Sequence, residues 1–380
     1  MVLANAKTIA CLGTILALFW CSSLWAQPLA PVTTDDWGLK IVIFDVGQGD
    51  GALLLTPNGQ AVIIDTGETS KHGETMAEYL LEKDKNGVKK IEIVEWMFVS
   101  HYHKDHIGGV RGLAGKIKCK AAFDQGPALL DHRNPKGSFT AYVRYVGDKD
   151  DDGREDRNEF GFVRHRARPG QEFKMGANEE VSIHVLSVNG DTAGTAQDLP
   201  LSPITLESDL NPGSLIQLVT LKDFEYVTTG DTTSNDWKKE PDSEEALIHA
   251  NAIPGGHDID VLKVAHHGSD TSSGRLFIES LRPEVAIISS TFKRRHKLPK
   301  LTSIKILETN GARVLVTGRA RDNNGKFHQS TNAFDDGYVP QRTTDELGTI
   351  TIFVAKDGSK YTVRSEKNPQ LALTFSSKDN

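Results

Sequence analysis

The amino-acid sequence predicts an α/β protein in which loops at the ends of strands carry the chemistry. Residues 39–67 contain three short apolar runs, separated by the bend DVGQGDG and by the turn TPNGQ, whose Asn-Gly pair is typical of a hairpin. Residues 74–90 predict an amphipathic helix, because Met76, Tyr79 and Leu80 recur at helical spacing. The apolar run IEIVEWMFVS then predicts a strand. This strand–hairpin–helix–strand order favours the α/β class.

The second half of the chain again alternates strands with helices. Strands are expected over 181–188, 213–221, 224–231, 260–269, 285–290 and 312–318, with a final hairpin over 348–365. Helices are expected over 273–283 and 300–311. Residues 124–175 are polar, irregular and rich in charge, which indicates an insertion.

The length and composition are those of a folded globular protein. The chain has 380 residues, of which 38% are hydrophobic and 25% are charged, and this excludes a disordered or fibrous class. We expect residues 27–380 to form a single domain. That domain would carry the insertion at about 124–175 and a C-terminal β-hairpin extension at about 320–375.

Residues 1–26 have the features of a secretory signal peptide. Lys7 precedes an apolar stretch, and the small residue Ala26 precedes the expected cleavage point. A membrane anchor is the alternative, since the stretch from Thr8 to Ala26 almost has the length of a membrane span. Cleavage predicts an exported protein, periplasmic or extracellular, that keeps only Cys119 and therefore has no internal disulfide. No later segment is apolar for long enough to predict a transmembrane helix.

The chain that remains after cleavage is acidic. Loss of Lys7 changes the formal net charge from −7 to −8, which excludes a long-range basic field for gathering nucleic acid. Two local basic clusters, at 163–169 and 292–300, are expected to be solvated surface and not a binding stripe. A small-molecule or nucleic-acid substrate is compatible with this charge, and no stable protein partner is implied.

Three histidines and one aspartate follow directly after the strand predicted over 91–100. His101 and His103 are two positions apart, so on an extended strand end they point to the same side. A loop can fold Asp105 and His106 back beside them. Imidazole nitrogens with a carboxylate suit zinc, manganese or iron. The alternative, a polar loop with surface histidines, is disfavoured by the number of ligands that follow one buried strand.

Other apolar strands also end in a metal-capable side chain. Asp65, Asp231 and the pair His266 and His267 stand at such positions. Strand ends that are far apart in the sequence can converge only if they share one face of the fold. If these do converge, they predict a two-metal site about 3.5–4 Å across, bridged by a carboxylate and a hydroxide.

The motifs DVGQGDG, IIDTG, SHYHKDHIGG, TTGD and AHHGSDTSS, in this order, resemble the metallo-β-lactamase superfamily. Within it, the chain resembles the soluble hydrolase domain of the bacterial competence DNA-uptake channel (ComEC-like) over residues 39–320. The resemblance implies an αββα sandwich with the metal site at one edge of the β-sandwich. It implies these ligands: His101 and His103 for the first metal, Asp105 and His106 for the second, Asp231 as the bridge, and His267, or alternatively His266, to complete the second site. Asp65 would brace the motif loop.

One departure from the family pattern concerns the first metal. Many members place a third histidine before the bridging aspartate, whereas this chain has Asn211 and Ser214 there, as the competence-type branch does. His184 could substitute, although a lone histidine in an alternating strand is more often structural. We therefore expect a weak or water-completed first site. Asn211, Ser214 and His296 are candidates for substrate contact.

A separate acidic motif lies within the insertion. The segment DKDDDGREDRNE fits the spacing of a calcium loop, with carboxylates at Asp148, Asp150, Asp152, Asp156 and Glu159. The flanking segments do not predict clear helices, and an acidic surface loop is the alternative. Calcium binding that orders the insertion is a hypothesis.

The resemblance implies a metal-dependent hydrolase that uses a metal-bound hydroxide, fixed by the catalytic residues Asp105 and Asp231. The features of residues 1–26 imply that it is exported. One or two divalent transition metals are expected, zinc before manganese. Phosphodiester, nucleic-acid-like substrates are favoured by the branch of the family. The alternatives are a β-lactamase or lactonase-type hydrolase of a cyclic amide or ester, and a non-catalytic metal-binding protein. The intact set of ligands disfavours the last of these.

Overall fold

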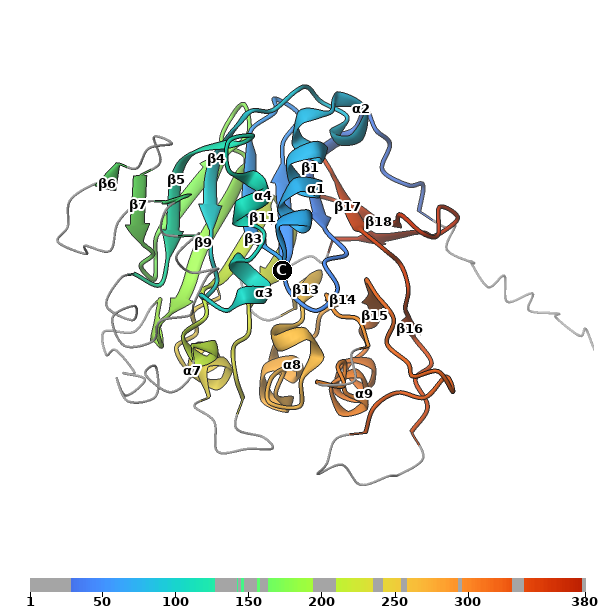
Figure 1. Ribbon diagram of the computed structural model, residues 1–380. Coiled ribbons are helices and arrows are strands. Elements are labelled where there is room, and N and C mark those ends of the chain that lie inside the picture. The colour runs from blue at the N-terminus through green and yellow to red at the C-terminus, as the bar shows by residue number, and fades with distance from the viewer. Residues whose placement is uncertain are drawn as a thin grey trace, which may run out of the picture.

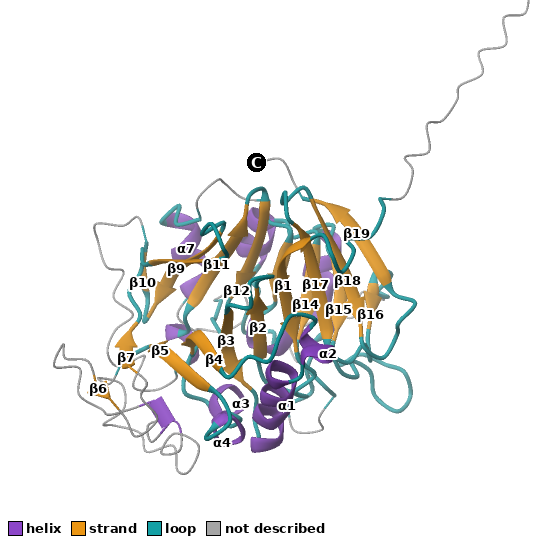
Figure 2. Cartoon of the chain, turned by 90° about the horizontal axis from the view of Figure 1, so that it is seen from above, coloured by secondary structure: helices purple, strands orange, loops and turns teal. Residues whose placement is uncertain are grey.

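Two β-sheets pack face to face, and helices cover the outer side of each sheet (Figures 1 and 2). The computed structural model describes residues 29–126, 142, 145–146, 156–157, 163–193, 210–234, 242–253, 258–292, 296–329 and 338–377. The four layers form the αββα sandwich that the family resemblance implies.

The first sheet has the strand order β19-β18-β17-β1-β2-β3-β4-β5-β7-β6 in the described part of the chain. Its strands are β1 (Trp37–Ile43), β2 (Gly51–Leu55), β3 (Ala61–Thr66), β4 (Ile93–Phe98), β5 (Lys118–Asp124), β6 (Asp156–Arg157), β7 (Val163–Arg166), β17 (Ile350–Ala355), β18 (Lys360–Ser365) and β19 (Ala372–Ser376). The hairpin predicted over 348–365 is present as β17 and β18. Because β17 pairs with β1, the C-terminal strands extend this sheet.

The second sheet has the order β10-β9-β11-β12-β13-β14-β15-β16, and β8 pairs with β9. Its strands are β8 (Glu172–Met175), β9 (Val181–Val188), β10 (Asp191–Thr192), β11 (Ile216–Leu221), β12 (Phe224–Thr228), β13 (Val261–Lys263), β14 (Val285–Ile288), β15 (Arg313–Val316) and β16 (Thr343–Thr344). The strands from β12 to β16 run parallel to one another.

The helices divide between the two outer faces of the sandwich (Figure 2). On the first sheet lie α1 (Ser70–Leu81), α2 (Lys83–Asn86), α3 (Lys104–Ile107) and α4 (Val110–Leu113), and on the second lie α7 (Ser243–His249), α8 (Arg275–Leu281) and α9 (Leu301–Thr309). Two 3-10 turns are η2 (Asn211–Gly213) and η3 (Ala265–Gly268). The single helix predicted over 74–90 is wrong in its bounds, because α1 begins at Ser70 and the extended backbone of Glu82 separates it from α2.

Alternation along the buried strands supplies the cores between these layers. In β3, Ile63 packs beneath α1 and α4, while Val62 and Ile64 face the second sheet. A third core, which includes Leu262 and Phe277, lies between the second sheet and its helices. The strands are apolar on both faces, as expected for sheets that are covered on both sides.

The carboxyl ends of parallel strands from both sheets meet at one edge of the sandwich. In the first sheet, β3 and β4 are parallel. Asp65 is the second-last residue of β3, and Ser100 follows β4. In the second sheet, β12 and β13 are parallel, with Asp231 after β12 and His267 after β13. Residues that are far apart in the sequence are thereby brought to a common edge.

The segment 163–175 corrects two expectations. It was expected to belong to an irregular insertion, but it contains β7 in the first sheet and β8 in the second. In its basic cluster, Arg166 and Arg168 are exposed as predicted, but Arg164 is buried, with Nε 2.7 Å from Oδ2 of Asp124. Arg164 also donates a hydrogen bond to the hydroxyl of Tyr102 at 3.2 Å. The cause is the strand alternation, which turns every second side chain inward.

Several predictions concern residues outside the described ranges. The signal peptide 1–26 is one of them, and so are the calcium-loop residues Asp148, Asp150, Asp152 and Glu159. The backbone of Asp156 begins β6. Within the described ranges, none of the helices has both the length and the apolar character needed to cross a membrane.

Candidate metal centre

Asp65 holds the loop that follows β4 from behind. Its Oδ1 accepts the backbone N–H of Ser100 at 2.8 Å, and its Oδ2 accepts the Ser100 hydroxyl at 2.6 Å. The same Oδ2 lies 2.8 Å from Nδ1 of His106. Asp65 therefore braces the motif loop, as the family resemblance implies.

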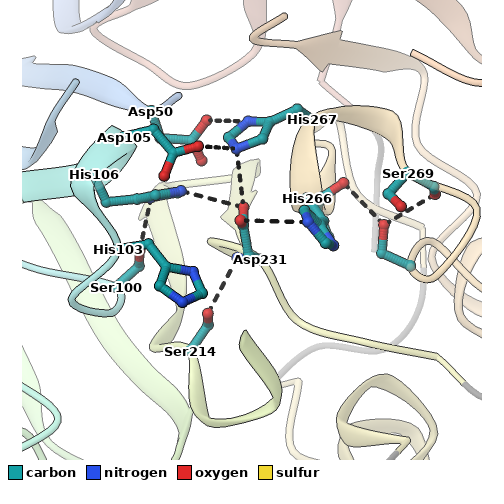
Figure 3. Close-up of polar contacts among 12 residues, drawn as sticks. Asp50, Ser100, His103, Asp105, His106, Ser214, Asp231, His266, His267 and Ser269 are labelled. Atoms are coloured by element: carbon teal, nitrogen blue, oxygen red, sulfur yellow. Dashed lines mark hydrogen bonds and ion pairs between the residues drawn. The ribbon is translucent and has the colours of Figure 1, made fainter. Parts of the chain in front are cut away.

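Asp231 lies at the centre of the site, and its two carboxylate oxygens face different histidines (Figure 3). Oδ1 is 3.3 Å from Nε2 of His106 and 3.5 Å from Nε2 of His267. Oδ2 is 3.8 Å from Nε2 of His101 and 3.9 Å from Nε2 of His266. A carboxylate that divides its oxygens in this way is placed to bridge two cations.

Two groups of ligand atoms share this carboxylate. We call each a donor group, and its ligand atoms lie within 4.8 Å of one another. The first donor group, at the predicted second metal, consists of Asp50, His106, Asp231 and His267. The second donor group, at the predicted first metal, consists of His101, His103 and Asp231. The strand ends that the sequence predicted to converge are therefore together. Asp50 is the site residue that sequence reasoning misses.

The bend DVGQGD reaches the site through a close backbone approach. The backbone N–H of Asp50 donates to the carbonyl oxygen of Asp105 at 3.2 Å. A Cβ on Gly49 would lie 2.4 Å from that same oxygen, and Gly49 has φ of +140°. Only glycine fits there. The Gly-Asp pair at the end of a strand bend is thus the sequence signal that could have identified Asp50.

The other two buried imidazoles are held in the same way as His106. Nδ1 of His267 lies 3.4 Å from Oδ1 of Asp50, and Nδ1 of His101 lies 3.1 Å from the hydroxyl of Ser100. An oxygen behind Nδ1 fixes the orientation of the ring and leaves Nε2 as the atom that faces the centre.

The buried charges favour an ionised carboxylate at the centre. Burial would raise the pKa of Asp231, but His267 and His106 outweigh it and hold this pKa well below its usual range. Burial together with the neighbouring imidazoles lowers the pKa of His101 well below its ordinary value. A neutral His101 ring has a lone pair that it can offer to a cation.

The residues present fit a divalent metal ion. Nε2 of His106, Nε2 of His267 and Oδ1 of Asp231 are buried. The two nitrogens lie 3.3 and 3.5 Å from that oxygen, but none of the three atoms forms a hydrogen bond of regular geometry among the described residues. Leaving converging polar atoms buried and unpaired is costly unless another group satisfies them. Imidazole nitrogens and carboxylate oxygens in this combination suit zinc and manganese.

The adjacent residues His266 and His267 occupy different places. Both have left-handed backbone, with φ of 46° and 54°, and they diverge from η3 (Figure 3). His267 is buried in the first donor group, and its Nε2 also lies 3.4 Å from Oδ2 of Asp105. His266 is half-buried, and its Nδ1 lies 3.1 Å from the hydroxyl of Thr271. Asp105 and His266 belong to neither donor group. Metal ligation by every residue of the predicted set stays a prediction.

Asn211 and Ser214 stand where many family members have a third histidine. The hydroxyl of Ser214 accepts the backbone N–H of Asp231 at 3.1 Å and lies 3.4 Å from Nδ1 of His101. Ser214 therefore supports the site from behind. His184 lies on β9 and belongs to neither donor group.

A cleft of about 450 Å³ opens onto the donor groups. The residues that line it include Gln48, Lys104, Asp105, Asn211, His266 and His296. Of the residues predicted to contact substrate, Asn211 and His296 thus line the cleft, whereas Ser214 is not among its lining residues.

Comparison with known proteins agrees with this geometry. The family model of the metallo-beta-lactamase superfamily matches residues 52–291. ComE operon protein 3 of Bacillus subtilis (strain 168) is 25% identical over 336 residues, which are 85% of this chain and 35% of that protein. Recombination protein 2 of Haemophilus influenzae is 25% identical over 289 residues, which are 75% of this chain and 29% of that protein. The chain spans about a third of the length of these curated relatives.

Among solved structures, the metallo-beta-lactamase fold protein YhfI of Bacillus subtilis is 13% identical, with a TM-score of 0.41. The match covers 73% of this chain and 96% of that one. The family model itself spans more than half of the chain. Together with the αββα fold and the histidine motif, this match shows that the chain belongs to the metallo-β-lactamase superfamily and is a hydrolase of that superfamily.

Proposed function

We propose that this protein is an exported phosphodiesterase that cleaves nucleic-acid-like substrates with one or two divalent metal ions, zinc or manganese. The observation that carries the proposal is the position of Asp231 between two donor groups, with one oxygen facing each. Paired metal sites that share a carboxylate suit hydrolysis of phosphodiesters, because the two metal ions can stabilise both the attacking and the leaving oxygen.

The residues of the chain hold the donors and orient the reacting atoms. Bound metal would lower the pKa of a coordinated water towards ~7 and polarise a substrate oxygen. Asp105 borders the cleft, where burial would raise its pKa, but His267 and His106 hold that pKa well below its usual range. Its ionised carboxylate can accept a hydrogen bond and orient a water beside Asp231.

The cleft offers groups that suit a phosphodiester. His266, His296 and Asn211 line it, and their side chains carry nitrogen donors of the kind that bind anionic phosphate oxygens. Lys104 also lines the cleft, although its Nζ lies 3.3 Å from Oε1 of Glu68. The cleft is therefore not strongly basic, and specificity for a phosphate would come from individual hydrogen bonds.

The substrate class is also supported by likeness to other proteins. The name of Recombination protein 2 points to nucleic acid for that protein. The motif order of this chain resembles the hydrolase domain of a DNA-uptake channel.

Export is supported by the features of residues 1–26. Fractionation of cells that produce the full chain tests it, since a cytoplasmic product would oppose export.

A substrate panel tests the proposed reaction. The purified protein, with its metal content measured, is assayed against bis-p-nitrophenyl phosphate, single-stranded DNA and nitrocefin in the presence of zinc or manganese. We expect metal-dependent cleavage of the two phosphodiesters and no turnover of nitrocefin. Turnover of nitrocefin alone would oppose the proposal and favour the β-lactamase alternative. A fully metallated protein that is inactive on every substrate would favour the non-catalytic alternative.

A further inference from the structure

The two buried histidines of the first donor group have different partners behind them. Asp65 lies behind His106, and Asp50 lies behind His267. Asp65 receives hydrogen bonds from Ser100, which is a neutral partner. Asp50 instead forms an ion pair with a buried cation.

That cation is Lys263, which lies on β13 four residues before His267. Its Nζ is 2.7 Å from Oδ1 of Asp50, and the side chains are only 4% and 7% exposed. The Lys263 ammonium also donates to the carbonyl oxygen of Val264 at 3.1 Å. A lysine buried to this degree is rare unless it is paired.

Oδ1 of Asp50 therefore faces two groups at once. It is 2.7 Å from the Lys263 ammonium and 3.4 Å from Nδ1 of His267. Burial would raise the pKa of Asp50, but Lys263 and then His267 outweigh this and keep the carboxylate ionised. The carboxylate also belongs to the set of ligand atoms that surrounds Asp231. Without a competing cation, it would be free to bind a metal ion directly.

We propose that Lys263 is a positioning residue that keeps Asp50 behind His267 and out of the metal coordination shell. In this arrangement Asp50 fixes the imidazole of His267 with Nε2 towards Asp231, and Lys263 neutralises the buried charge of Asp50. The inference rests on the metal seat of the proposed function but not on the choice of substrate. Carboxylates that hold a metal-binding histidine in this way contribute to the affinity for the metal.

A merely structural ion pair would behave differently. If the pair only anchored the bend that carries Asp50 to β13, loss of either partner would weaken metal binding alike. If Lys263 acts through Asp50, loss of Asp50 weakens metal binding and loss of Lys263 does not. Removal of Asp50 releases the ring of His267, whereas removal of Lys263 frees a carboxylate that can move onto the ion.

The test uses the full protein and the metal ions alone. Metal affinity is measured by calorimetry, and coordination is read from the visible spectrum of the Co²⁺-loaded protein. Asp50→Asn is expected to weaken binding by about 10–100-fold. Lys263→Met is expected to bind at least as tightly as the wild type, with a spectrum changed towards higher coordination number. The double variant should bind no more tightly than the wild type and no more weakly than Asp50→Asn, because Lys263 has no carboxylate to restrain once Asp50 is neutral and its own unpaired charge is removed.

Lys40→Met is the matched control, because Lys40 is a buried lysine on β1 whose Nζ donates to the carbonyl oxygen of Asn86 at 2.6 Å. Equal weakening by Lys263→Met and Asp50→Asn, or an unchanged Co²⁺ spectrum in Lys263→Met, would overturn the inference. So would a double variant that binds more weakly than Asp50→Asn. That last comparison remains available if Lys263→Met does not fold, since the double variant buries no unpaired charge. Failure of phosphodiester cleavage alone would leave these binding results intact.

Discussion

Oδ2 of Asp65 lies 2.8 Å from Nδ1 of His106, and both side chains are buried. This contact joins the end of β3 to the loop after β4, so it sets the direction in which His106 presents Nε2. Asp65→Asn is expected to reduce metal affinity by about 10–100-fold, because an amide orients an imidazole less strongly than a carboxylate does. Calorimetric titration with Zn²⁺ checks this.

The control for Asp65→Asn is Asp260→Asn. Asp260 is also buried, and its Oδ2 accepts the backbone N–H of Glu225 at 2.9 Å, at the opposite end of β13 from the site. The control should lose stability without a change in metal affinity. Equal loss of affinity in both variants would mean that general destabilisation, and not orientation of His106, explains the effect.

Local patterns predicted much of this fold and of the site. His101, His103 and His106 lie within six positions, so their convergence follows from one strand end and one short loop. Asp231 and His267 were predicted because each follows an apolar strand, and the family resemblance supplied the shared edge. The positions of β9, β14, α8 and α9 also follow from apolar runs and their flanking turns. The strand expected over 260–269 is wrong in its bounds, because β13 ends at Lys263 and the 3-10 turn η3 follows it. The strand β5 was not predicted.

The remainder depends on contacts that no local pattern contains. Asp50 enters the site only because Gly49 allows the bend to lie against the backbone of Asp105. From the sequence alone, Arg164 is predicted to belong to a solvated basic cluster. Only the pairing of β7 with β5 brings its partner Asp124 beside it. Both errors concern pairing between distant segments, which periodicity within one segment does not reveal.

His103→Ala is expected to remove metal-dependent activity without unfolding the protein. His103 contributes a ligand atom to the second donor group and is only half-buried, so little packing is lost. Activity should fall more than about 100-fold, since loss of a direct ligand exceeds the effect of an outer one. Rates with bis-p-nitrophenyl phosphate and thermal unfolding are measured together. His184→Ala, another half-buried histidine, should keep full activity; activity retained in His103→Ala would contradict the site.

Gly109→Ala is expected to destabilise the protein by about 3 kcal/mol. A Cβ on Gly109 would lie 1.9 Å from the carbonyl oxygen of Thr66 and 3.0 Å from the backbone N of Gly73. Backbone atoms cannot yield as a flexible side chain can, so α4 would have to move away from β3. Urea denaturation measures the loss. Gly51→Ala, in which the nearest contact of the added Cβ is the Val46 side chain at 3.3 Å, should lower the unfolding free energy less. Equal losses in the two variants would show that contact with the Thr66 backbone does not cause the destabilisation.

The ionisation of Glu244, which is not among the candidate metal ligands, makes the stability of the protein depend on pH. Its carboxylate accepts the backbone N–H groups of Ser273 and Gly274, both at 2.8 Å, and so fastens the segment that follows the paired histidines to α7. Burial raises the pKa of Glu244 from 4.5 to about 8, despite the opposing effect of these hydrogen bonds. The folded state therefore holds a proton that the unfolded state releases.

Because the pKa of Glu244 is higher in the folded state, its contribution to stability is fully present below pH 4.5 and is lost as the pH rises to about 8. Each unit of pKa difference corresponds to about 1.4 kcal/mol, so the loss is on the order of a few kcal/mol. Glu244→Gln cannot ionise. The difference in unfolding free energy between wild type and this variant, measured on metal-free protein, should therefore shift against the wild type between pH 5 and 8 and level off above pH 8. A difference that stays constant over this interval would show that Glu244 ionises equally in the folded and unfolded chains.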